Sequence, residues 1–268
     1  MTSGLVDAWA SGDAYERYIG RWSRPVAAQF VEWLECRRGA SWLDVGCGTG
    51  ALGETILDRA SPGRVVGLDL SFEYLKVAKR RLTNAGARFI VARAQQLPVP
   101  AQAFDAVVSG LALNFVPTPD AVVSEMRRVA RKGAVVAVYL WDYAGAMQLI
   151  RYFWDAAVAL DKDAATMDEG QRFPLCSPDR LEALFRETGL DDVDTRSIEV
   201  PTHFIDFDDY WLPFLGAQGP APGYVVTLSE ERRGRLRDTI RHALPVAKDG
   251  SIALTARAWA VRGIKPGK

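Results

Sequence analysis

The sequence predicts a doubly wound α/β fold, in which helices cover both faces of a mainly parallel β-sheet. Two observations support this prediction. Between residues 41 and 141, short apolar runs of strand length alternate with segments whose apolar residues have helical spacing. The first run leads into a loop with glycine at three alternate positions, and a helical pattern follows that loop directly. The element order is therefore β-α-β-α-β-loop-β-α-β, which right-handed crossovers fold into one parallel sheet.

The elements of this region are bounded by residues that start or stop helices. Proline is tolerated in a first helical turn, so a helix is predicted from Pro25 to about Glu35. Ser71 can cap another helix, which keeps its apolar period until Gly86. Gly133 is predicted to end the last helix of the region. The other predicted elements are strands at 42–45, 65–69, 88–92, 104–109 and 134–140, and helices at 51–59 and 121–131.

After Trp141 the pattern is less regular. The aromatic segment 202–247 predicts a helical cap inserted before the last strand, rather than a separate domain. Residues 1–22 combine aromatic side chains with arginines and predict a lid over a site. The remaining elements are expected as helices at about 144–161 and 178–188 and strands at about 192–200 and 251–262.

We therefore expect a single domain over residues 1–268. Its parts are an N-terminal lid and helix at 1–38, a ligand-binding core at 39–142, and a C-terminal part at 143–268 that contains the cap. A chain of this length fits either one large α/β domain or two small ones, so the choice depends on the element pattern.

Charge and composition are those of an ordinary globular protein. Of 268 residues, 49% are hydrophobic and 25% are charged, and 33 Lys plus Arg balance 33 Asp plus Glu. No net field attracts polyanions, so nucleic acid is not expected as a partner. The sequence lacks both an apolar run of about 20 residues and a basic-then-apolar leader, so we expect a cytoplasmic protein without membrane contact. The three cysteines have neither disulfide nor metal-pair spacing, so we expect no metal.

The glycine loop spans residues 43–50, with the sequence Leu-Asp-Val-Gly-Cys-Gly-Thr-Gly. Glycines let a ligand approach the backbone closely, and the amides at the start of the next helix face whatever binds there. Residues 48–53 also satisfy G-x-G-x-x-G, with Asp69 about 20 residues on, so a dinucleotide is an alternative ligand. Asp44 argues against it, because its carboxylate would repel a pyrophosphate and would suit an ammonium or sulfonium group.

At this point the sequence resembles the class I S-adenosyl-L-methionine-dependent methyltransferases. The resemblance implies a Rossmann-like, mainly parallel seven-stranded sheet, S-adenosyl-L-methionine as cofactor, and methyl transfer to a small-molecule acceptor. Its motifs occur in the family's order over roughly residues 40–141. They are the glycine loop at 43–50, Gly-Leu-Asp-Leu-Ser at 67–71, Ala-Gln-Gln-Leu-Pro at 94–98, Phe-Asp-Ala-Val-Val-Ser at 104–109, and a fifth strand led by Gly133.

The resemblance also implies roles for individual residues. Asp44 would lie near the cofactor's ammonium, and Asp69 would accept from both ribose hydroxyls, since a carboxylate is an acceptor only. For Asp69 the alternative is a helix-capping acid. Leu70 would pack on the adenine, the Ala94 amide would meet an adenine nitrogen, and Ser109 would line the methionine side. The loop residues expected to wrap the methionine part are Gly46, Cys47, Gly48 and Gly50.

Arg93 departs from the family's pattern, which has an acid before this alanine that accepts from the adenine amino group. A guanidinium has no acceptor atom to offer. Gln95 could replace that contact through its side-chain carbonyl, or Arg93 could simply point to solvent.

Residues 14–23 resemble the entry segment of bacterial methyltransferases of the ubiquinone-biosynthesis group. In this segment Arg21 could pair with the methionine carboxylate, an interaction that guanidinium geometry favours. An exposed arginine at a helix end is the alternative.

The acceptor is expected beyond the carboxyl ends of the fourth and fifth strands, where open α/β sheets bind ligands. The candidate residues there are Asn114, Trp141, Tyr143 and, from the cap, Trp211. His203 is the only candidate base, and a structural role is the alternative for it. Two other functions remain open at this stage, namely an NAD(P)-dependent oxidoreductase and a non-catalytic methyltransferase-like binding protein.

Overall fold

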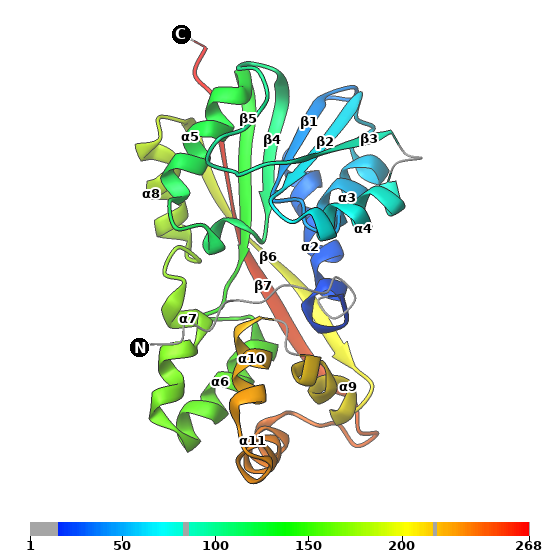
Figure 1. The fold of residues 1–268 in the computed structure, drawn as a ribbon, viewed down its shortest axis with the longest axis vertical. Coiled ribbons are helices and arrows are strands. Elements are labelled where there is room, and N and C mark those ends of the chain that lie inside the picture. The colour runs from blue at the N-terminus through cyan, green and yellow to red at the C-terminus, as the bar shows by residue number, and fades with distance from the viewer. Residues whose placement is uncertain (1–15, 83–85, 217–218, 268) are drawn as a thin grey trace. The chain divides into compact units, whose positions relative to one another are not determined.

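The computed structural model describes residues 16–82, 86–216 and 219–267, so most of the expected lid, residues 1–15, lies outside the described residues. One seven-stranded sheet runs through the fold (Figure 1), with strand order β3-β2-β1-β4-β5-β7-β6. The mainly parallel seven-stranded fold expected from the sequence is confirmed. The strands are β1 (Ser41–Val45), β2 (Arg64–Asp69), β3 (Ala87–Val91), β4 (Phe104–Gly110), β5 (Ala130–Trp141), β6 (Asp191–Phe204) and β7 (Ile252–Ile264).

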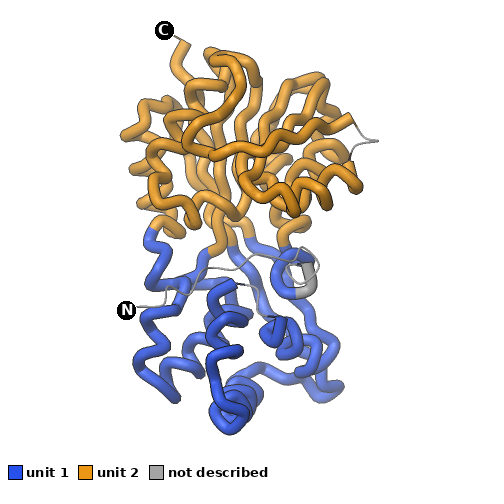
Figure 2. Tube along the Cα trace, in the orientation of Figure 1, with its two compact units in different colours: residues 1–22, 142–174, 199–257 blue, residues 23–141, 175–198, 258–268 orange. Residues whose placement is uncertain are grey.

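The chain divides into two compact units (Figure 2). Unit 1 consists of residues 1–22, 142–174 and 199–257, and unit 2 of residues 23–141, 175–198 and 258–268. Strands β6 and β7 continue from one unit into the other along the chain. This division into compact units does not test the expectation of a single domain, which stays a prediction.

Unit 2 contains the parallel part of the sheet. Strand β1 lies between β2 and β4 and is parallel to both, and β5 continues the parallel order beside β4. On its other side, β5 pairs with β7 in an antiparallel register. Helices α3 (Ala51–Arg59) and α4 (Phe72–Leu82) pack on β2, and α5 (Pro119–Val129) packs on β4 and β5. The strands are nearly continuous apolar runs because helices cover both faces of a parallel sheet. The other helices with residues in this unit are α2 (Arg21–Trp33) and α8 (Pro178–Glu187).

Unit 1 is mainly helical around an aromatic core. Phe153 stacks on Phe214 with ring centroids 4.7 Å apart, and Tyr18 meets Phe214 edge-on at 5.3 Å. These rings are fully buried, so each contributes a large apolar area to the unit. The elements are η1 (Glu16–Gly20), α6 (Gln148–Leu160), η4 (Lys162–Met167), α7 (Glu169–Arg172), α9 (Phe207–Trp211), η5 (Leu212–Gly216), α10 (Pro220–Thr227) and α11 (Glu230–Ala243).

Two predicted boundaries are wrong for identifiable reasons. Helix α5 ends at Val129, not near residue 131, because the chain enters β5 at Ala130. Gly133 does not end the helix: it has a φ of +73° inside β5, where the register against β4 shifts. Helix α6 begins at Gln148, later than expected, because Asp142 accepts a hydrogen bond from the Ala146 amide and holds this stretch as turns.

No helix in the described part of the chain is both long and apolar enough to cross a membrane.

Candidate active site

The three loop glycines all have positive φ, which L-residues rarely adopt. A Cβ on Gly46 would lie 2.8 Å from the Ala112 Cβ, and one on Gly50 would lie 3.0 Å from Leu82 Cδ1. By contrast, no atom lies within 4 Å of the Cβ position of Gly48. The outer glycines are therefore required for packing, whereas Gly48 leaves its backbone open to a ligand.

Backbone hydrogen bonds hold the loop on the carboxyl end of β2. The amides of Gly46 and Cys47 both donate to the Leu68 carbonyl, at 2.8 and 2.9 Å, and the Gly48 amide donates to Asp69 Oδ2 at 2.9 Å. The loop is thus fixed from the next strand before any ligand binds.

Asp44 is a buried carboxylate beside this loop. It is 1% exposed, and neither oxygen accepts a hydrogen bond from any described residue. Burial raises its pKa from 3.8 to about 8, and the nearby Asp69 carboxylate raises the pKa as well. The Gly53 backbone N–H lowers the pKa, without reaching hydrogen-bond geometry. A buried carboxylate without a donor is a strong site for a cation.

Asp69, at the end of β2, is hydrogen-bonded through both oxygens. Oδ1 accepts from the Ser71 amide at 2.8 Å and Oδ2 from the Gly48 amide. Each carboxylate oxygen has a further lone pair, so two hydroxyl donors can still be accepted. The alternative role of Asp69 as a helix-capping acid is compatible with this geometry, because the Ser71 amide that donates to it lies just before the start of α4.

Apolar side chains are exposed at the same edge of unit 2. Leu70 is 62% exposed directly after Asp69, and Val91 ends β3 with its side chain also exposed. Large apolar residues at a carboxyl edge provide a surface on which a flat heterocycle can pack.

The loop after β3 contains the residues expected on the adenine side. The Ala94 amide donates no hydrogen bond to any described residue. Arg93 is exposed and forms no ion pair within the described ranges, which agrees with the interpretation that it points to solvent. Gln95 is half-buried and has no hydrogen-bond partner there, so its contact with the adenine stays a prediction.

Two further expected cofactor residues are buried in unit 2. Ser109 lies in β4 and is 2% exposed. Cys47 Sγ packs against Gly67, where a Cβ would come within 2.9 Å of it. Burial raises the pKa of the Cys47 thiol well above its ordinary value, so this cysteine is a neutral packing group.

Asn114 and Trp141 are the expected acceptor residues of unit 2. Asn114 lies in η3 (Leu113–Phe115), just after β4, and Trp141 is the last residue of β5. Asn114 Nδ2 and Trp141 Nε1 are both buried, and neither finds a hydrogen-bond acceptor among the described residues.

The remaining expected residues lie in unit 1. Tyr143 is buried against Phe173, at 5.7 Å between ring centroids, and Trp211 is buried within the aromatic core. Arg21 does not stand as an isolated helix-end arginine: its Nη1 lies 2.9 Å from Asp209 Oδ1, and its guanidinium covers two aromatic rings. His203 is exposed on β6, on the face opposite its buried neighbours at 202 and 204, so its placement does not support a role as base.

Sequence reasoning missed three buried acids, Asp142, Asp168 and Glu169, of which Glu169 is the most deeply buried. Glu169 is 2% exposed and accepts a hydrogen bond from Trp154 Nε1. Burial raises its pKa from 4.5 to about 7. Its surroundings in the sequence, Asp-Glu-Gly-Gln-Arg, are typical of a solvated helix start, so no signal marked it as buried.

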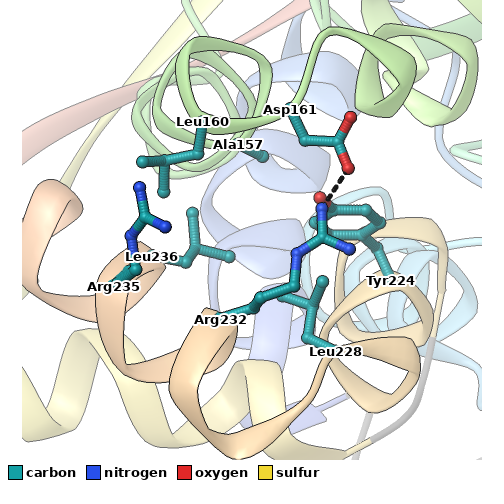
Figure 3. A pocket seen from close by; sticks show the side chains of 8 residues that line it. All are labelled: Ala157, Leu160, Asp161, Tyr224, Leu228, Arg232, Arg235 and Leu236. Carbon is teal, nitrogen blue, oxygen red and sulfur yellow. Dashed lines mark hydrogen bonds and ion pairs between the residues drawn. The ribbon is translucent and has the colours of Figure 1, made fainter.

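Unit 1 also contains a small pocket, shown in Figure 3, between α6, α10 and α11. An ion pair between Arg232 and Asp161 lies at the pocket, with Tyr224 beside it. Its volume of about 30 Å³ holds little more than one water molecule, so it is too small for an organic acceptor.

Comparisons with known proteins agree with the loop geometry. Residues 43–138 match the family described as a methyltransferase domain. A demethylmenaquinone methyltransferase of Geobacillus kaustophilus is 28% identical over 210 residues, covering 72% of this chain and 87% of that protein. A malonyl-[acyl-carrier protein] O-methyltransferase of Hamiltonella defensa is 38% identical over 97 residues, covering 36% of each chain.

The fold has relatives among solved structures as well. A phosphoethanolamine N-methyltransferase 2 of Haemonchus contortus, in complex with phosphomonomethylethanolamine and S-adenosylhomocysteine, superposes with a TM-score of 0.60. The two chains are 17% identical, and the match covers 95% of this chain and 56% of the other.

The reported relatives favour methyl transfer over the oxidoreductase alternative, in agreement with the acid that precedes the glycine loop. Residues 43–138 match a methyltransferase domain, and the chain is similar to a demethylmenaquinone methyltransferase over 72% of its length.

Proposed function

We propose that this enzyme transfers the methyl group of S-adenosyl-L-methionine to a small organic acceptor by in-line displacement, with the glycine loop of unit 2 as the cofactor site. The relatives' names include a demethylmenaquinone and a phosphoethanolamine methyltransferase, both of which point to small acceptors. The observation that carries the proposal is the Asp44 carboxylate, which is buried beside the loop without a hydrogen-bond donor. S-adenosyl-L-methionine meets that requirement with its ammonium group, whereas a dinucleotide would bring an anionic pyrophosphate to this loop.

The loop residues fit the two ends of this cofactor. Asp44 would meet the ammonium, and the open backbone at Gly48 would allow the methionine chain to approach. Asp69 retains lone pairs for the two ribose hydroxyls, and the exposed Leu70 offers an apolar surface to the adenine. The other residues that we assign to the cofactor are Gly46, Cys47, Gly50, Ala94, Gln95 and Ser109.

Arg21 is the expected cofactor residue whose charge is already paired. Its guanidinium pairs with Asp209 within unit 1, and that pairing competes with a methionine carboxylate. We therefore omit Arg21 from the proposed cofactor site.

When bound, the cofactor supplies a methyl carbon activated by a positively charged sulfur. The residues of this chain then have two tasks, to align the acceptor with that carbon and to exclude water. Buried aromatic and amide side chains at the ends of β4 and β5 suit both tasks. No side chain in the described ranges compels a base, so we assign none, and a protonated acceptor would lose its proton to solvent.

Calorimetric titration of the full chain tests the cofactor. We expect S-adenosylhomocysteine to bind and NADH not to bind. Asp44→Asn should weaken binding by at least about 10-fold, since it removes a charge-assisted hydrogen bond. Asp58→Asn, which alters an exposed acid on α3, is the matched control and should bind normally. Binding of NADH without S-adenosylhomocysteine would overturn the proposal.

Incubation with S-adenosyl-L-methionine labelled in its methyl group then tests the reaction. A panel of small phenols, enolisable ketones, amines and thiols is screened for transfer of label. Transfer to at least one acceptor, lost in Asp44→Asn and retained in Asp58→Asn, is the expected result. Tight cofactor binding with no transfer to any of the four classes would instead favour a non-catalytic role.

A further inference from the structure

Two hydrogen-bond donors are buried without an acceptor at the same edge of unit 2. Trp141 is 1% exposed, and its indole N–H meets no acceptor among the described residues. The same holds for the Nδ2 of Asn114, whose side chain is half-buried. An indole can only donate, whereas an amide can present either its N–H or its carbonyl. Leaving a buried donor unpaired is costly, so such a pair needs an explanation.

The backbone brings Asn114 and Trp141 to the same edge of the sheet. β4 and β5 are parallel neighbours, with Gly110 opposite Tyr139, so both strands end at one edge. Directly after β4, the Leu111 amide donates to the Tyr139 carbonyl at 2.8 Å, two residues before Trp141. The short helix η3, which contains Asn114, packs on β5.

The same segment lies against the cofactor loop. The Ala112 Cβ stands 2.8 Å from where a Cβ on Gly46 would be. Leu111 has a φ of +59°, a left-handed conformation that costs a leucine about 1 kcal/mol or more and often occurs at functional sites. The turn that carries Asn114 is therefore held in a strained form beside the glycine loop.

Trp42 provides a comparison within the same sheet. Its indole N–H is also buried without an acceptor, so an unpaired indole alone does not identify a site. However, Trp42 is the second residue of β1 and lies toward the amino end of that strand, away from the edge where α/β sheets bind ligands. Unlike Trp42, Trp141 combines the unpaired donor with that edge and with a second unpaired donor on the turn after the neighbouring strand.

We propose that Trp141 and Asn114 hold an oxygen of the methyl acceptor, and that this acceptor reacts as an oxyanion, the phenolate or enolate form of a small hydroxylated or carbonyl compound. The inference rests on the proposed function. The acceptor loses its proton to solvent, and the two N–H groups bind the resulting oxyanion. An electron pair of the acceptor, on the oxygen or on the conjugated carbon, forms the bond to the methyl carbon. The pair of the broken carbon–sulfur bond stays on sulfur, which becomes neutral.

The test uses the full chain saturated with S-adenosylhomocysteine and two chromophoric probes, 4-nitrophenol and 4-nitro-1-naphthol. The absorbance of each probe reports its ionisation as it binds. We expect the bound form to be the anion and the apparent pKa of the probe to fall. Trp141→Phe and Asn114→Ala should each weaken binding of the anion at least about 10-fold, and Asn114→Asp more, because a carboxylate repels it.

Trp42→Phe is the matched control, since it removes an equally buried indole N–H, and it should leave probe binding unchanged. Failure of both probes to bind, binding without preference for the anion, or equal effects of Trp42→Phe and Trp141→Phe would each overturn the inference. Binding of S-adenosylhomocysteine is measured for every variant. If it persists together with label transfer, only this inference has failed; if the unaltered chain does not bind it, the proposed function has failed.

Discussion

Asp44 should make cofactor binding depend on pH. With a pKa of about 8, this carboxyl is about 1% ionised at pH 6 and about half ionised at pH 8. An ordinary α-ammonium group loses its proton at about pH 8. The fraction of the ligand that carries a charged ammonium therefore falls by roughly half over the same interval. The product of the two fractions rises about 20-fold from pH 6 to pH 8 and declines at higher pH. Affinity should therefore follow a bell-shaped curve with its maximum near pH 8.

The same raised pKa predicts an effect on folding. A carboxyl whose pKa is raised by folding stabilises the fold below its unfolded value, here 3.8, and that contribution is lost as the pH rises through about 8. At pH 7 the cost of Asp44 to the unliganded fold is at most about 4 kcal/mol, at about 1.4 kcal/mol per unit of pKa. Asp44→Asn should therefore melt at a higher temperature than the unaltered chain at pH 8, although it binds cofactor more weakly.

Calorimetry with S-adenosylhomocysteine between pH 5.5 and about 9, with thermal melts in the same buffers, measures both effects. Asp44→Asn should lose the acidic limb of the curve. Asp69→Asn should keep that limb and move it to lower pH, because the Asp69 charge is one cause of the raised pKa of Asp44. An acidic limb that persists in Asp44→Asn, or a variant that is less stable than the unaltered chain at pH 8, would refute the reasoning.

Three further outcomes follow from single contacts. Gly46→Ala should cost more than about 2 kcal/mol in chemical denaturation, because a Cβ would clash at 2.8 Å, whereas Gly133→Ala, with the same φ of +73° and no atom within 4 Å, should cost only about 1 kcal/mol. Asp142→Asn should destabilise the fold by about 2 kcal/mol, since it removes the carboxylate that lies 2.6 Å from Arg257 and leaves Glu199, at 3.5 Å, as a weaker counter-ion; equal melts would count against this contribution of Asp142. Glu169→Gln should flatten the pH dependence of stability between 4.5 and about 7, where its raised pKa makes the unaltered chain lose stability as the pH rises; a slope unchanged in the variant would contradict that assignment.

The parallel sheet and the glycine loop could be predicted because their signals are local. The loop glycines come directly after β1 and all adopt a positive φ, and Asp69 is the last residue of β2. The α5 boundary was less predictable. Gly133 is typical of a helix stop, but here its positive φ serves a register shift between β4 and β5, and strand pairing is not visible in one segment.

The structure of unit 1 was harder to predict from the sequence, because it depends on contacts between residues that lie far apart along the chain. The start of α6 is delayed by Asp142, whose partner Arg257 lies 115 residues further along the chain. Glu169 is buried because Trp154, on a different element, donates to it. A sequence pattern fixes which face of a helix is apolar, but not which polar side chain another element covers. This explains why Arg21 was expected to be available to a ligand, whereas Asp209 pairs with it.

The two carboxylates of the cofactor loop illustrate how environment separates residues that look alike in sequence. Asp69 receives one backbone N–H on each oxygen, so its charge is already stabilised and it remains an acceptor for neutral hydroxyls. Asp44 receives none, so its charge is costly until a cation arrives. Exchanging the two environments would exchange their ligand preferences. A loop with one satisfied and one unsatisfied carboxylate therefore selects a ligand that has hydroxyls at one end and a positive charge at the other, and it disfavours one that would place an anionic pyrophosphate beside Asp44.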